Sequence, residues 1–134
     1  MTLVDTSVFV DYFRGTSTPA VEVLRQLVAD DAEICMSPYT YQELLQGARD
    51  DLEFVRLKRV LSTQEFLWLP QTVTTFEKAG RLYFDLRRAG VTVRSTVDVL
   101  IALTAIEYKV SLLHSDHDFD HMAVAVEGLQ IYAV

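Results

Sequence analysis

The chain has 134 residues, of which 50% are hydrophobic and 23% are charged, and it contains a single cysteine. This composition excludes a disordered or collagen-like chain, and one cysteine excludes an intrachain disulfide or a cysteine-based zinc cluster. The formal net charge of −7 argues against a protein that binds nucleic acid through a global positive field. It leaves open an enzyme whose acidic pocket holds cations.

The length fits one domain, residues 1–134, without a linker-like segment or an internal repeat. No apolar stretch reaches the ~20 residues that a membrane span needs. The first residues lack a basic region and include an acid, Asp5, which is not a secretory signal pattern. We therefore expect a soluble, cytoplasmic protein that has no membrane partner.

Strand and helix signals alternate along the chain. Short apolar runs predict strands, and Ser or Thr ahead of a proline or an amphipathic run predicts a helix start. In chain order we expect a strand at 2–4, helices at 6–13 and 18–29, a strand at 33–36, helices at 37–48 and 52–61, a strand at 66–69, helices at 72–89 and 95–108, a strand at 110–113, a helix at 119–126 and a strand at 129–133. This order predicts a doubly wound, three-layer α/β/α fold around a parallel sheet.

Acidic residues gather at one edge of this predicted sheet. Asp5 ends the first strand, Asp116 and Asp118 follow the fourth strand, Glu43 lies in the helix after the second strand, and Asp98 lies one turn into the helix before the fourth. Ligands of such sheets bind outside the carboxyl ends of the strands, so we expect these carboxylates to converge. An oxygen-only cluster suits Mg²⁺ or Mn²⁺, which can polarise a phosphoryl oxygen and activate water for in-line attack. The residues alone therefore predict metal-assisted phosphodiester hydrolysis.

Asp98 is the most informative of these acids. The residues after it, VLIALTAI, are apolar on every side, which predicts a buried helix. An isolated buried charge costs several kcal/mol, so Asp98 needs a metal, a hydrogen bond or a counter-ion. The structural alternatives are an ion pair with Arg94 and a contact with the helix dipole. For Glu43, the alternative is a solvated position on a helix.

Four segments, in order, resemble the PIN-domain VapC toxins, the ribonuclease halves of bacterial toxin–antitoxin pairs. They are LVDTSVFVDYFRG at 3–15, ELLQG at 43–47, DVLIA at 98–102 and LLHSDHDF at 112–119. Together they span essentially the whole chain. The resemblance implies a single PIN domain with a five-stranded parallel sheet in the order 3-2-1-4-5 and an acidic pocket above it. It also implies endoribonuclease activity that stops growth when the antitoxin is absent.

The resemblance implies a role for each acid. Asp5 and Asp98 would be the core ligands of Mg²⁺, for which Mn²⁺ can substitute. Glu43 and Asp116 would complete the acidic quartet, and Asp118 would support it.

Neighbours of these acids carry further expectations. Ser7 or Thr6 would orient the Asp5 carboxylate or a bound water by hydrogen bonding. His114 stands where many members of the family have threonine. The candidate RNA contacts are Arg14, Arg49, Arg56, Lys58, Arg59 and Arg94.

The resemblance also implies partners: a VapB-like antitoxin that packs on an apolar groove and blocks the pocket, and a second copy of the chain in a homodimer. The residues that could supply such a groove are Tyr12, Phe13, Val23, Leu24 and Leu27.

Other classes of function stay open at this point. His114, His117 and His121 could hold Zn²⁺ together with Asp118 or Asp120. A phospho-acceptor receiver domain shares the parallel sheet and the acidic Mg²⁺ pocket. A PIN domain that only binds, or one that acts on DNA, is a further alternative.

Overall fold

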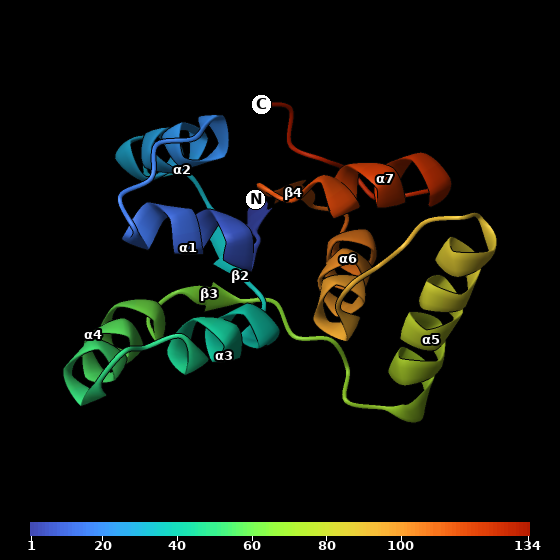
Figure 1. Ribbon diagram of the computed structural model, residues 1–134, viewed down its shortest axis with the longest axis horizontal. Coiled ribbons are helices and arrows are strands. Elements are labelled where there is room, and N and C mark those ends of the chain that lie inside the picture. Colours follow the sequence, from blue (N-terminus) through green and yellow to red (C-terminus); the bar gives the residue numbers. More distant parts are fainter.

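The computed structural model describes residues 1–134 and has a parallel sheet with helices packed on both faces (Figure 1). The strands are β1 (Thr2–Val4), β2 (Ile34–Met36), β3 (Glu65–Phe66) and β4 (Ser111–Leu113). The helices are α1 (Thr6–Phe13), α2 (Pro19–Ala29), α3 (Pro38–Gln46), α4 (Asp51–Leu61), α5 (Val73–Arg88), α6 (Thr96–Tyr108) and α7 (His117–Ala125). The strand order is β3-β2-β1-β4, and every pairing is parallel.

Successive side chains of the strands enter two separate cores, one on each face of the sheet. Leu3, Cys35 and Leu112 belong to the core under α5, α6 and α7. The next residue of each strand faces the opposite core, under α1, α2, α3 and α4, and these residues are Val4, Met36 and Leu113. The period-two alternation of a strand therefore produces the predicted three layers.

The predicted fifth strand is wrong, because residues 129–133 make only one isolated parallel bridge, between Leu112 and Ile131. Two backbone bonds hold it, from the Leu112 amide to the Gln130 carbonyl and from the Tyr132 amide to the Leu112 carbonyl, each 2.9 Å long. The tail lies where a fifth strand would lie, beside β4. The tail has a neighbouring strand on one side only. That strand, β4, is three residues long, which leaves little backbone for further pairing.

The third strand is also shorter than predicted, covering 65–66 and not 66–69. Beyond it, one further bond runs from the Leu67 amide to the Met36 carbonyl, 2.9 Å, and β2 then ends.

Helix starts follow the predicted capping residues in most cases. Thr18, Ser37, Thr72 and Ser95 each accept a hydrogen bond from a backbone amide in the first turn of the helix that follows. At α1 and α7 the capping side chains are instead Asp5 and Asp116, and α7 begins at 117, two residues before the predicted start. Two of the predicted site acids are therefore fixed in place by capping.

No helix has both the length and the apolar character that crossing a bilayer requires.

Candidate active site

Asp5 lies at the carboxyl end of β1 and is 3% exposed. Its Oδ2 accepts hydrogen bonds from the Ser7 amide at 3.0 Å and from Ser7 Oγ at 2.6 Å, while its Oδ1 is buried and has no hydrogen-bond partner. Burial raises the pKa of Asp5, and the hydrogen bonds from Ser7 oppose that rise. Ser7, not Thr6, is therefore the side chain that orients Asp5.

Ser7 also connects Asp5 to the loop that follows β4. Its Oγ accepts a hydrogen bond from the Ser115 amide at 3.0 Å, across 108 residues of sequence. This contact ties the start of α1 to the segment that carries Asp116 and Asp118.

Asp98, Asp116 and Asp118 form the tightest group of carboxylates, with one oxygen from each lying within 4.8 Å of the others. Asp98 is in the first turn of α6, because Ser95 caps that helix by accepting a hydrogen bond from the Val97 amide at 3.1 Å. Burial, and then the charges of Asp5 and Asp116, raise the pKa of Asp98 to about 7. Carboxylates this close favour a cation between them.

The ion pair between Asp98 and Arg94, considered as a structural alternative, is not formed. The Arg94 Nε instead lies 3.4 Å from Asp118 Oδ2, an oxygen that is buried and has no hydrogen bond. Because the Arg94 side chain is 80% exposed, this contact leaves most of the guanidinium facing solvent. No ion pair therefore neutralises Asp98.

His114 holds the loop that presents Asp116. Its Nδ1 accepts a hydrogen bond from the Asp116 amide at 3.2 Å, so its Nε2 carries the proton and donates to Asp120 Oδ1 at 3.0 Å. The ring is tilted against the buried Phe119, with 5.4 Å between the ring centroids. In this chain a histidine and an aspartate thus anchor the segment that follows β4.

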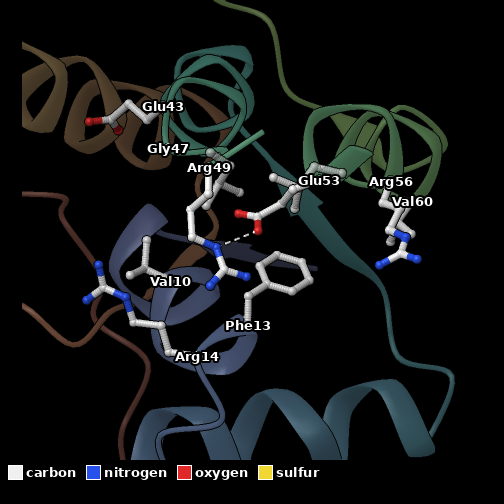
Figure 2. A pocket seen from close by; sticks show the side chains of 11 residues that line it. Val10, Phe13, Arg14, Glu43, Gly47, Arg49, Glu53, Arg56 and Val60 are labelled. Atoms are coloured by element: carbon white, nitrogen blue, oxygen red, sulfur yellow. Dashed lines mark hydrogen bonds and ion pairs between the residues drawn. The ribbon is translucent and has the colours of Figure 1, made fainter. Parts of the chain in front are cut away.

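Glu43 lies at the end of a groove between α1, α3 and α4, with a volume of about 740 Å³. Its Oε1 accepts a hydrogen bond from Thr6 Oγ1 at 2.7 Å, and Thr6 Oγ1 is 3.0 Å from the buried Thr40 Oγ1. Figure 2 shows the Glu43 carboxylate turned away from the ion pair that Arg49 and Glu53 form inside the groove at 2.8 Å. Glu43 and Asp5 are close enough that the charge of Glu43 raises the pKa of Asp5.

The groove is lined by apolar side chains and by arginines. Its apolar side chains are Val10, Phe13, Leu44, Leu57 and Val60, and its arginines are Arg14, Arg49 and Arg56. Of the residues expected to form an apolar docking groove, Phe13 lines it. Leu24 does not, because it is 2% exposed and belongs to the core.

The structure thus brings three of the six expected RNA contacts, Arg14, Arg49 and Arg56, to this groove, while Arg94 lies against Asp118. The groove does not include Lys58 or Arg59.

The histidines do not assemble a zinc site. His114 and His117 both approach Asp120, at 3.0 and 3.6 Å, but the side chain of His117 is 93% exposed. The one group of potential ligands with metal-binding spacing is the three aspartates.

The aspartate group fits a hard divalent cation. All of its ligand atoms are carboxylate oxygens, which Mg²⁺ and Mn²⁺ prefer, and two buried oxygens of the site, Asp5 Oδ1 and Asp118 Oδ2, have no hydrogen bond. The group of three aspartates includes Asp118 but neither Asp5 nor Glu43. The resemblance described above implies only a supporting role for Asp118.

Two further residues hold the site acids or their neighbours. Thr40 precedes Glu43 by three residues and shares its helix face, a spacing that could have indicated it. The sequence indicated Asp120 only as a possible zinc ligand, because its hydrogen bond with His114 depends on how the loop after β4 folds.

Comparison with known proteins defines the class. Residues 2–125 match the family model of the PIN domain, so the chain belongs to the PIN-domain family. Within that family it is similar to ribonuclease VapC11 of Mycobacterium tuberculosis, with 42% identity over 92% of both chains. It is also similar to ribonuclease VapC19 of the same organism, with 34% identity over 84% of this chain and 86% of VapC19. It is therefore a VapC ribonuclease toxin, which excludes the receiver-domain alternative.

Solved structures show the same fold. The chain superposes on VapBC2 of Rickettsia felis, bound to a promoter DNA fragment, with a TM-score of 0.72 at 19% identity over 98% of this chain and 96% of that one. VapBC-1 of nontypeable Haemophilus influenzae gives a TM-score of 0.71 at 20% identity over 98% and 96% of the two chains.

Proposed function

We propose that this chain cleaves RNA internally, using Mg²⁺ held by Asp98, Asp116 and Asp118, with Asp5 and Glu43 completing the catalytic acids. The observation that carries this proposal is the group of three aspartates within 4.8 Å of one another at the carboxyl edge of a parallel sheet. No ion pair neutralises Asp98, whose pKa is about 7, so the folded chain stabilises a cation there. Mn²⁺ has the same ligand preference and should substitute.

The bound ion would polarise a phosphoryl oxygen and lower the pKa of water. The side chains of this protein supply the geometry. Ser7 fixes one oxygen of Asp5 and leaves Oδ1 free to face the site. His114 fixes the backbone of Asp116, and Thr6 fixes Glu43. Arg94, beside Asp118 and largely exposed, can hold a substrate phosphate near the reacting centre.

Basic residues in the groove beside Glu43 would hold the RNA chain. Arg14 and Arg56 line the groove that ends at Glu43 and form no ion pair, and Arg49 shares its charge with Glu53. We propose that these arginines contact phosphates. For Lys58 and Arg59 an RNA contact stays a prediction from the sequence.

An antitoxin is the proposed protein partner. The structural neighbours from Rickettsia felis and Haemophilus influenzae are VapBC assemblies, and one from Klebsiella pneumoniae is described as a toxin–antitoxin complex. A VapB-like antitoxin that fills the groove beside Glu43 would cover the apolar side chains of the groove and block access to the acids. We propose in addition that the chain forms homodimers and works in the cytoplasm, where its RNA substrate is.

Expression without an antitoxin tests the function in cells. The wild-type chain should arrest growth of its host and fragment cellular RNA, and Asp5→Ala should relieve both effects at equal protein level. Unimpaired growth with abundant folded wild-type protein would favour a PIN domain that only binds.

A further inference from the structure

An exposed aromatic ring surrounded by arginines occupies the outer face of α5. Phe84 is 38% exposed. The guanidinium carbons of Arg81, Arg87 and Arg88 lie 5.4, 5.8 and 5.6 Å from the centroid of its ring. We call these four residues the α5 platform. The buried residues of α5 are Thr75, Ala79 and Leu86, so Phe84 points away from the core and packing does not explain it.

The platform has the opposite charge to the chain as a whole. Residues 81–94 contain four arginines and one acid, Asp85, in a chain of net charge −7. Asp85 pairs with Arg81 at 3.0 Å, while Arg87 and Arg88 take part in none of the ion pairs of the molecule. Two positive charges beside an exposed ring are therefore free to bind an anionic partner.

A short loop connects the helix that carries the platform to the acidic site. The loop after α5 begins at Gly90, whose φ of +81° turns the chain sharply, and leads to Arg94 beside Asp118. Figure 1 shows this loop leaving the end of α5 and returning to the start of α6. The loop, Asp118 and the outer side of α7 line a hollow of about 570 Å³. The backbone therefore connects Arg88, at the end of α5, to Arg94 beside Asp118 through this loop.

We propose that the α5 platform binds the single-stranded RNA segment that flanks the cleaved bond on the Asp118 side. Phosphates complement the unpaired guanidinium groups, and an unpaired base can stack on the Phe84 ring or on a guanidinium plane. Duplex RNA does not expose its base faces in this way. The proposal rests on the function proposed above and adds a substrate path that runs away from the groove beside Glu43.

Equilibrium binding of a labelled single-stranded RNA of mixed sequence, in EDTA so that nothing is cleaved, tests the platform. Arg87→Ala/Arg88→Ala should reduce the slope of log affinity against log salt by about 1.4, since each phosphate contact on a single strand contributes roughly 0.7. The matched control, Lys78→Ala/Lys109→Ala, removes the same charge from exposed positions on α5 and after α6 and should leave the slope unchanged.

The aromatic component has its own pair of variants. Phe84→Leu should weaken binding about 5-fold or more, because a stacked base contributes on the order of 1–3 kcal/mol, and Phe84→Trp should retain it. Phe76→Leu is the matched control, since Phe76 is 50% exposed on the same helix and has no guanidinium over its ring.

Wild-type affinity and salt slope in both platform variants would overturn the proposal, as would equal losses in the platform and control variants. A changed mass in solution with unchanged RNA binding would assign the platform to contact between copies of the chain and overturn it as well. These failures differ from a failure of the proposed function, in which the wild-type protein itself does not cleave RNA with Mg²⁺.

Discussion

Asp98 lies in the first turn of α6, whose next seven residues, 99–105, are all buried, and its nearest charged neighbours are acids. Its place in the structure therefore costs stability unless a cation is bound. We predict that Asp98→Asn abolishes cleavage, while the metal-free variant melts at the same temperature as the wild type or higher. Added Mg²⁺ should raise the melting temperature of the wild type more than that of the variant. A large drop in melting temperature, with the remaining folded protein still active, would refute the metal-ligand role.

The same carboxyl predicts a pH dependence of stability. The pKa of Asp98 is raised from 3.8 to about 7, so between these values the folded state holds a proton that the unfolded chain has lost. The destabilisation is therefore fully present above about pH 7 and is relieved as the pH falls below it. Without metal, the wild type should melt at a higher temperature as the pH drops through the upper part of this window. Asp98→Asn should respond less, and an identical response in both proteins would contradict the assignment.

Ser7 gives a test of how Asp5 is held. Ser7→Ala removes the 2.6 Å hydrogen bond to Asp5 and the acceptor for the Ser115 amide. A hydrogen bond to a charged group contributes about 1.5–3 kcal/mol, so urea unfolding with Mg²⁺ present should show a loss of that order. The melting-temperature response to Mg²⁺ should also be smaller, and Ser7→Thr should restore both. Wild-type values in Ser7→Ala would show that Asp5 is positioned by its backbone alone.

At the scale of elements, α6 is the helix on which the position of Asp98 depends. Its residues are apolar on every side, and the structure buries it between the sheet and α5, as the sequence predicted. Ile101, at 0% exposure, is at the centre of this packing. Ile101→Ala should lower the free energy of unfolding by about 2–5 kcal/mol, measured by urea titration.

The control for that measurement is Val124→Ala on α7, where the side chain is 91% exposed and the change should stay within about 0.5 kcal/mol. Equal effects of the two substitutions would contradict the burial of α6.

The elements that could be predicted are those with a local signal. Capping residues marked the starts of four helices, at Thr18, Ser37, Thr72 and Ser95. The fifth strand and the length of β3 could not be predicted in the same way. β-prone residues such as those at 129–133 form a strand only where a neighbouring strand offers enough backbone, and sequence composition does not report that.

For the site, the sequence predicts that the acids converge but does not predict the partner of each acid. Asp5, Asp98, Asp116 and Asp118 lie at a strand end, at a helix cap or in a first helical turn, and Glu43 lies in the second turn of α3, so the order of elements decides their places. The partners of Asp116 and Asp118 depend on loop conformation. His114 contacts Asp116, and Arg94 contacts Asp118, from backbone segments that lie outside any helix or strand. The sequence therefore could not show that Arg94 pairs with Asp118 and not with Asp98.

At the scale of the whole molecule, a net charge of −7 coexists with two basic regions, the groove beside Glu43 and the α5 platform. The groove with Arg14, Arg49 and Arg56 meets the site at Glu43, and the α5 platform approaches it through Arg94. Anionic RNA would thus be held by both basic regions, beside a centre that needs a cation to accept a phosphate. Because the acids would repel a phosphate in the absence of a cation, we predict that cleavage strictly requires a divalent ion.

Cleavage of RNA by the purified, antitoxin-free protein tests this requirement most directly. We predict cleavage with Mg²⁺ or Mn²⁺, none with EDTA, and none by Asp98→Asn under any of these conditions. Equal cleavage in EDTA would contradict the metal mechanism. Activity that only Zn²⁺ restores and that His117→Ala abolishes would place the chemistry at the histidines and contradict the assignment to the three aspartates.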